Sequence, residues 1–222
     1  MSARWDWGVV AQVLPHLIEG LVVTLQAVAG GTAIALVLGM VWALLRRSSR
    51  RWLTAPVGLL VELVRSTPLL VQLYFFYYSV LPALGLAGQP LVTGVVALGV
   101  HYSTYTSEVY RSGIDGIARG QWEAAWALGL TRWQAYRHVI LPQAVPPVIP
   151  VLGNYVIAMF KDSPLLAAIA VVEVLTRALS FGAEHFRYLE PLTMVGVLYL
   201  VMSSLSGRAT RWLELRYAVT KE

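Results

Sequence analysis

The sequence contains no cysteine and carries little charge. Only 13% of its 222 residues are Asp, Glu, Lys or Arg, against about 25% in soluble domains. Without cysteine the chain has no disulfide, no thiolate metal site and no cysteine nucleophile, and its redox compartment cannot be read. So little charge cannot cover a globule of this size with a wetted surface, which excludes a soluble enzyme or regulatory domain.

Sequence motifs for nucleotide binding, catalysis and metal binding are also absent. There is no G-x-x-x-x-G-K-S/T loop for a nucleotide and no nucleophile–base motif. The histidines His16, His138 and His185 are scattered without metal-ligand spacing. We therefore expect no catalytic residue, no metal and no cofactor bound by this chain, and a role other than an enzyme.

Apolar residues make up 57% of the chain, and the mean hydropathy is +0.63. This composition predicts an all-α integral membrane protein, with residues 1–222 as a single transmembrane domain. Because about 20 apolar residues cross the hydrocarbon of a bilayer, we predict five spans. They cover roughly residues 20–45, 57–81, 91–112, 144–161 and 190–207. No clean internal repeat is present.

The formal charge of +5 comes largely from three basic segments. In a membrane protein such an excess reports topology more often than nucleic-acid binding, so no nucleic-acid partner is expected. With five spans, all three segments fall on one side, which the positive-inside rule makes cytoplasmic. The N-terminus is then outside and the C-terminus cytoplasmic. The segments are Arg46, Arg47, Arg50 and Arg51; Arg111, Arg119, Arg132 and Arg137; and Arg208, Arg211, Arg216 and Lys221.

The polar segment 113–143, between the third and fourth predicted spans, has the pattern of two short helices. Residues 121–128 are helix formers, and Gly129 stands where a helix-terminating glycine is common. Thr131 and Gln134 have capping-box spacing for a second helix, which Pro142 is expected to end. The segment is either a surface connector held by interfacial tryptophans or a docking knob for the groove of a soluble partner.

The same segment resembles the EAA motif, which marks the membrane subunits (permeases) of ABC importers. The resemblance lies in Glu123-Ala124-Ala125, Gly129 and the run Val139-Ile140-Leu141-Pro142, with Val139 where Ile is usual. It implies a type I importer permease fold, a multi-pass place in a bacterial plasma or inner membrane, and a coupling helix at 121–128. The ATPase-coupling residues carried over are Glu123, Ala124, Ala125, Gly129, Leu141 and Pro142.

Further stretches are similar to the polar amino acid branch of these permeases, notably residues 65–72, 111–113, 142–144 and 161–165. Within the branch, residues 101–111, 159–162 and 186–191 look most like the ectoine/hydroxyectoine permease subunit. The resemblance implies import of polar amino acids or a compatible solute such as ectoine. It also implies cytoplasmic ATPase subunits that hold ATP and magnesium, a second permease that is the same or similar, an extracytoplasmic solute-binding protein and membrane lipid as partners.

Polar side chains inside the predicted spans are candidates for the translocation pathway. Charged groups there are expensive, about 2.5–3.5 kcal/mol on insertion scales, and need partners or water. Glu62 and Arg65 have the spacing to pair on one helix face, either as an anchor of the second span or in the pathway. His101, Thr104, Tyr105 and Glu108 share a face of the third span, which we expect to line the pathway. Glu108 could instead pair with Arg111.

Three more polar residues lie in or beside the fourth predicted span. We expect Asn154 to bond across helices, and Lys161 and Asp162 to form a plain interface pair or a gate. The full set of pathway candidates is therefore His101, Thr104, Tyr105, Glu108, Asn154, Glu62, Arg65, Lys161 and Asp162.

Two other functions compete with the importer permease. A stand-alone secondary transporter or channel would need no ATPase, and the two predicted short helices at residues 121–141 would then have no evident function. A membrane enzyme would need a catalytic constellation, which the sequence does not offer. Co-purification with an ATPase subunit would separate the permease from both.

Overall fold

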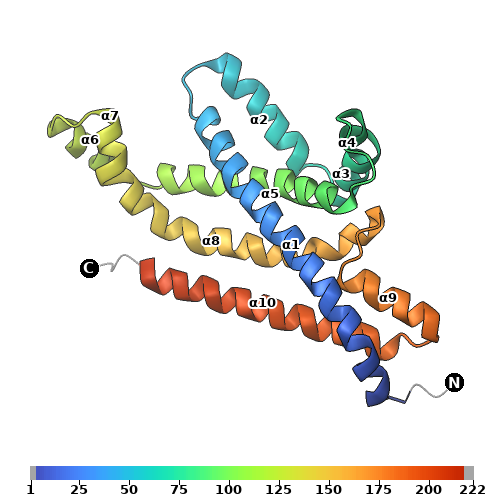
Figure 1. Ribbon diagram of the computed structural model, residues 1–222. Helices are drawn as coiled ribbons and strands as arrows, with labels where there is room; N and C mark the ends of the chain where they lie inside the picture. Colours follow the sequence, from blue (N-terminus) through green and yellow to red (C-terminus); the bar gives the residue numbers. More distant parts are fainter. Residues whose placement is uncertain (1–3, 218–222) are drawn as a thin grey trace.

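The computed structural model describes residues 4–217, and every regular element in this range is helical (Figure 1). The α-helices are α1 (Trp7–Arg46), α2 (Arg51–Arg65), α3 (Leu69–Phe75), α4 (Leu81–Ala83), α5 (Pro90–Asp115), α6 (Arg119–Ala127), α7 (Arg132–Ala135), α8 (Leu141–Asp162), α9 (Val174–His185) and α10 (Leu189–Tyr217). Phe76–Val80 and Tyr136–Ile140 are π-helical turns, and Ser163–Ile169 is a 3₁₀ helix. The all-α prediction is confirmed.

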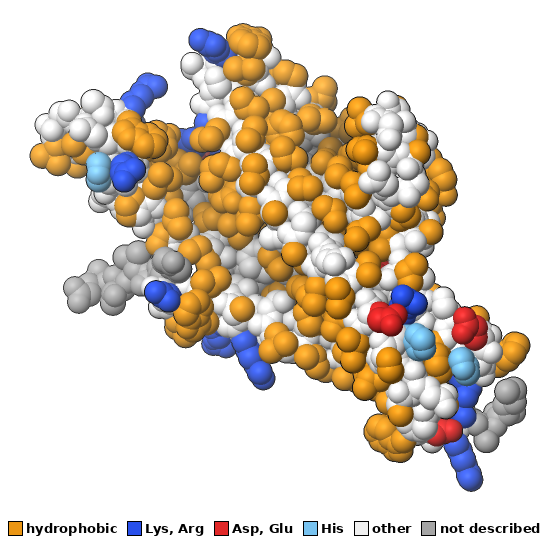
Figure 2. Space-filling view, in the orientation of Figure 1, with side chains coloured by type: hydrophobic (Ala, Val, Ile, Leu, Met, Phe, Trp, Pro, Cys, Tyr) orange, Lys and Arg blue, Asp and Glu red, His pale blue; other side chains and the backbone are white. Residues whose placement is uncertain are grey.

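The bundle is built around α5. The second half of α1 packs on α5, from Gly30 against Val95 to Arg47 against Asp115. Helices α8 and α3 also contact α5, and α10 runs beside α8 (Figure 1). The main apolar core joins residues of α1, α3, α5, α8 and the 3₁₀ helix, with Leu73, Leu98 and Leu166 fully buried. Many large hydrophobic side chains are exposed, and they cover much of the face drawn in Figure 2. This is the distribution expected where lipid replaces water around the protein.

The helix that contains the first predicted span is longer than that span. Helix α1 is continuous over 40 residues and begins at Trp7, not at residue 20. The Asp6 side chain accepts a hydrogen bond from the Gly8 amide and caps it. Val13 and Leu17 then pack against Val174 and neighbouring residues of α9. Charge-free runs alone could not reveal this packing.

The second predicted span, residues 57–81, is not one helix. It breaks at Ser66–Pro68 into α2 and α3, which are bent by 108°. Pro68 has no amide hydrogen, and proline disfavours helical geometry at the residue before it. The break places Gln72 against α5.

Within residues 4–217, three helices are able to cross a membrane by length and apolarity alone, or up to four if the bent pair counts as one span. The three are α1, the run Arg132–Ile169 that contains α8, and α10. Helix α5, which matches the third predicted span, is 26 residues long but more polar. Its polar side chains are buried in protein: His101, Ser103, Thr104, Thr106 and Ser107. A helix buried in the bundle does not need an apolar surface.

The last part of the chain is more helical than predicted. Helix α8 agrees with the fourth predicted span to within a few residues, whereas α10 extends well past residue 207. Between them, Ser163–Ile169 is a 3₁₀ helix with Leu166 and Ile169 buried in the core. Helix α9 was not predicted. Its buried side chains pack against α1 and α10, and its exposed side mixes apolar and polar residues, such as Leu179 and Glu184.

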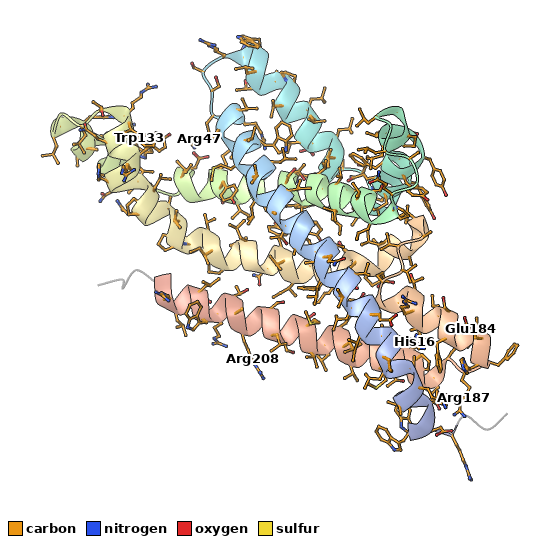
Figure 3. The ribbon with its side chains drawn as sticks, viewed as in Figure 1. His16, Arg47, Trp133, Glu184, Arg187 and Arg208 are labelled. Carbon is orange, nitrogen blue, oxygen red and sulfur yellow. The ribbon has the colours of Figure 1, made fainter. Side chains whose placement is uncertain are left out.

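The described residues of the three basic segments gather at one end of the bundle, and Lys221 lies outside the described range. Arg47 at the end of α1 forms an ion pair with Asp115 at the end of α5. Gly153 of α8 packs on Thr210 of α10, so the end of α10 lies beside the start of α8. Figure 3 shows Arg47 and Arg208 toward this end and His16, Glu184 and Arg187 at the opposite one. This arrangement agrees with a single cytoplasmic side, and the orientation in the cell stays a prediction.

Small residues let α1 and α5 approach closely. A Cβ atom added to Gly39 would lie 2.0 Å from Thr106 Oγ1 and 2.9 Å from the Ser103 carbonyl oxygen. One turn away, Thr106 Oγ1 donates a 2.7 Å hydrogen bond to the Ala35 carbonyl. Contacts of this kind hold membrane helices together through packing of small residues.

Gly39→Val is therefore expected to destabilise the protein. The added methyl groups would separate the helices and break the Thr106 bond, at a cost of about 1–3 kcal/mol. Membrane abundance and thermal unfolding in detergent measure the effect. Gly196→Val is the control, because nothing lies within 4 Å of a Cβ atom there. Equal stability of the two variants would contradict the close approach.

Candidate functional site

The segment 113–143 forms two short helices outside the main bundle, as the sequence predicted. Helix α6 ends in a Schellman arrangement, in which the Leu130 amide donates to the Ala125 carbonyl and the Gly129 amide to the Trp126 carbonyl. Gly129 has a φ of 71°, which a residue with a side chain adopts only with strain. Thr131 and Gln134 form the predicted capping box at the start of α7.

The α6 helix presents most of its side chains to the outside. Glu123, Ala124 and Leu128 are exposed, Leu128 at 77%. Ala125 is buried and faces inward. Glu123 Oε1 accepts a 2.8 Å hydrogen bond from Arg119, but both side chains are open to solvent, so this pair adds little stability. The helix is thus a small surface with one acidic side chain and apolar neighbours.

Pro142 does not end the second helix, contrary to the prediction. The chain continues from α7 through the π-helical turn Tyr136–Ile140 into α8, where Pro142 lies in the first turn. A proline ring normally clashes with the carbonyl four residues earlier. The wider π turn gives that ring room, and such turns often occur at functional sites. Leu141 and Pro142 are both exposed at this joint.

A pair of glutamines connects α6 to this joint. Gln143 Nε2 donates to the Val139 carbonyl at 2.7 Å and to Gln121 Oε1 at 3.1 Å. Gln121 lies in α6 and Gln143 in α8. Beneath them, Trp122 and Tyr136 pack against the buried Ile140. The two-helix segment therefore touches the long helix both through side-chain hydrogen bonds and through an apolar cluster.

Three arginines from three helices surround Glu108. Its carboxylate forms ion pairs with Arg46 of α1, with Arg65 of α2 at 3.4 Å and with Arg111 at 3.2 Å. The Glu108 side chain is 26% exposed. The predicted alternative, a pair with Arg111, is confirmed, and Arg46 and Arg65 are added to it. Nearby, burial removes part of the hydration of the half-buried Arg47 guanidinium, but its ion pair with Asp115 outweighs this and raises the pKa of Arg47.

The predicted pair of Glu62 with Arg65 does not form. Arg65 turns to Glu108 and lies 5.4 Å from the Tyr105 ring centre, while Glu62 accepts a hydrogen bond from Ser66 Oγ. The break after Arg65 directs this side chain toward α5 instead of along its own helix. A local i, i+3 rule could not anticipate that choice.

The predicted face of α5 meets protein along its length. His101 Nδ1 lies 3.1 Å from Gln72 Oε1 of α3. Thr104 is buried and donates to the carbonyl of His101 in its own helix. Tyr105 is half-buried against Tyr155 of α8 and the Arg65 guanidinium. His101, Tyr105 and Glu108 thus connect α5 to α1, α2, α3 and α8.

The predictions for α8 are corrected. Asn154 is exposed and makes no hydrogen bond within residues 4–217, so it does not bond across helices of this subunit. Lys161 and Asp162 do not pair with each other in the described part of the chain. Asp162 instead accepts a 2.7 Å hydrogen bond from the Tyr102 hydroxyl of α5, and Lys161 is exposed.

Sequence reasoning missed Arg46, Gln72, Tyr102 and the Gln121–Gln143 pair. Each acts with a partner at least 22 positions away in the chain. The sequence held a usable signal only for the ion pairs of Arg46 and Arg65 with Glu108. Arginines at the ends of the predicted spans outnumber the carboxylates beside them, so several arginines are expected to share one carboxylate. No metal-binding cluster of three or more His, Cys, Asp or Glu occurs in the described range.

A family model described as "Binding-protein-dependent transport system inner membrane component" matches residues 35–219. The helical bundle, with its long apolar helices and its exposed two-helix segment at the basic end, is the type I importer permease fold of this family. The chain belongs to this family and is a multi-pass membrane protein.

Individual relatives span nearly the whole chain. The chain is 46% identical over 212 residues to the probable amino-acid ABC transporter permease protein y4tG of Sinorhizobium fredii, covering 93% of this chain and 91% of that one. It is 34% identical to the glutamine transport system permease protein GlnP of Escherichia coli, covering 97% and 99%. A crystal structure of an amino acid ABC transporter with histidines superposes with a TM-score of 0.89 at 32% identity, over 96% of this chain and 99% of that one.

Proposed function

We propose that this chain is the permease subunit of an ATP-driven importer for polar amino acids. Two permeases, the same or similar, form the pathway, and an extracytoplasmic binding protein delivers the solute. ATP and magnesium are held by cytoplasmic ATPase subunits and not by this chain. The supporting observations are the family membership and the two relatives whose names give amino-acid transport.

The observation that carries the mechanism is the exposed helix α6, closed by Gly129 and joined to α8. In this proposal α6 docks in a groove of the ATPase subunit. The exposed Glu123 and Ala124 make the contact, and the buried Ala125 packs beneath them and holds the helix against the joint. Closure of the ATPase dimer displaces α6. The Gln121–Gln143 contact and the cluster around Ile140 pass this displacement through Leu141 and Pro142 to α8. ATP thereby favours one facing state of the pathway and hydrolysis restores the other.

The pathway itself is proposed to follow the polar face of α5 and the neighbouring part of α8. Tyr105 and Glu108 are partly exposed on this face and would line the pathway, whereas His101 and Thr104 are buried behind them and would hold the face in place. Glu62 and Arg65 lie at its basic end. Asp162 and Lys161 lie at the other end of α8. Asn154, exposed in one subunit, is available to a second permease or to water in the pathway.

Uptake by the reconstituted complex tests this function. Proteoliposomes with the permease, its ATPase and its binding protein should accumulate labelled glutamine or another polar amino acid only with ATP inside. Ectoine remains a prediction from sequence resemblance, so it is offered as a competitor in the same assay. Uptake driven by an ion gradient without the ATPase would instead identify a secondary transporter or channel.

Gly129→Val is expected to weaken coupling. Its positive φ costs a β-branched residue about 1–2 kcal/mol, and relief of that strain would unwind the end of α6. We expect ATP-driven uptake to fall about fivefold while abundance in the membrane stays near normal. Gly129→Asn is the matched control, because asparagine tolerates this backbone region better. Equal uptake by both variants would show that the turn geometry does not matter.

A further inference from the structure

The basic end of the bundle carries an apolar cavity of about 470 Å³ that the proposed transport cycle does not use. Its walls come from four segments: the end of α1, the end of α5, the α7 region and the first turns of α8. The lining includes Leu44, Ile114, Trp133, Tyr136, Leu141 and Val145. Several of these side chains are open to the surroundings: Leu44 at 58%, Trp133 at 68% and Val145 at 44%. An apolar hollow of this kind on the outside of a membrane helix bundle suits a hydrocarbon chain.

A second cavity, of about 540 Å³, adjoins the first, and its rim is basic instead of apolar. Tyr136 lines both cavities, and Arg47 directly follows the last residue of α1, about one turn beyond Leu44. The second cavity is lined by three arginines, Arg47, Arg119 and Arg132, and by aromatic side chains of α6. Figure 3 shows Arg47 and Trp133 at the same end of the bundle.

The charges at this rim favour an anion. Arg47 is paired with Asp115 and Arg119 with Glu123, while Arg132 has no acidic partner within residues 4–217. The three arginines therefore outnumber the two carboxylates beside them. Basic pockets between membrane helices on the cytoplasmic side bind anionic lipid headgroups.

We propose that the two cavities form one site for an anionic phospholipid. An acyl chain occupies the apolar cavity between α1 and α8, and the phosphate lies at Arg132 in the basic one. The lipid then lies against Tyr136 and Leu141, the joint between α7 and α8, and supports it from the membrane side. This inference goes beyond the proposed transport function and does not depend on which solute is carried.

Lipid retention by the purified permease–ATPase complex tests the site. The complex is extracted in mild detergent, incubated with phosphatidylglycerol or phosphatidylcholine, and bound lipid is counted by native mass spectrometry. Arg132→Gln should lower bound phosphatidylglycerol about fivefold, the effect of one lost surface cation, and leave phosphatidylcholine unchanged. Val145→Trp should fill the apolar cavity and lower both lipids. The controls are Arg211→Gln and Val201→Trp, which change exposed side chains of α10.

Two results would overturn the proposal. One is equal phosphatidylglycerol retention by Arg132→Gln and Arg211→Gln. The other is a protein in the cavity, which Val145→Cys would reveal in this cysteine-free chain. Efficient cross-linking from that position to a second permease or to the ATPase would show that protein covers the site. Because retention needs no transport, neither result depends on the proposed solute.

Discussion

ATP-driven uptake is expected to fall about tenfold or more when Glu123 is replaced by lysine. Glu123 is exposed on α6, and its removal leaves no buried group unpaired, so the variant should fold and insert normally. A reversed charge in a docked interface juxtaposes like charges, which costs several kcal/mol. Uptake and ATPase stimulation by the loaded binding protein, measured at equal permease abundance, check this expectation.

The neighbouring arginine provides the control. Arg119→Gln removes the same exposed ion pair but leaves the Glu123 carboxylate in place. If the carboxylate contacts the ATPase, Arg119→Gln should keep most of the uptake. Normal uptake by Glu123→Lys would contradict the docking role of α6, and equal losses in both variants would assign the effect to the ion pair within the helix.

A second large effect is expected at Glu108. Glu108→Gln leaves Arg46, Arg65 and Arg111 close together without their shared counter-charge at the edge of the membrane. Unpaired charges in such a place are expensive, and we expect a loss of stability on the order of 2 kcal/mol together with at least a tenfold loss of uptake. Thermal unfolding of the purified complex and uptake per inserted permease separate the two effects.

A second, compensating substitution tests whether the unpaired positive charge causes the loss of stability. The double variant Glu108→Gln with Arg46→Gln removes one cation and should recover part of the lost stability. For thermal unfolding, Glu62→Gln is the matched control, because Glu62 contacts only Ser66 among these groups and is exposed. A Glu108→Gln protein that unfolds at the same temperature as the unmodified one would refute the role of the arginine cluster.

Much of the fold could be predicted from local patterns. The capping box at Thr131, the glycine after α6 and the apolar runs of α8 and α10 each depend on residues near one another in the chain. Their physical basis is backbone hydrogen bonding and the thickness of the bilayer, which act over a few turns. These features were confirmed with shifts of a few residues, except at the end of α10.

Contacts between distant residues could not be predicted in this way. Arg65 lies three positions from Glu62 and yet pairs with Glu108, because the 108° break after α2 directs it toward α5. Asp162 lies beside Lys161 and yet binds Tyr102, because α8 packs on α5. Such choices depend on how helices cross, and a single sequence carries no direct signal for that. The first turns of α1 and the helix α9 were not predicted for the same reason, because they pack against each other although they are far apart in the chain.

Site-directed cross-linking of α6 tests the central claim most directly. The chain has no cysteine, so Leu128→Cys provides one thiol on the exposed face of this helix. Leu179→Cys on α9, at the other end of the bundle, is the control. A short thiol cross-linker should join the Leu128→Cys permease to an ATPase subunit in cells and leave the Leu179→Cys permease unjoined. Failure to capture an ATPase at Leu128, or labelling of that thiol by a membrane-impermeant reagent from outside intact cells, would contradict the account.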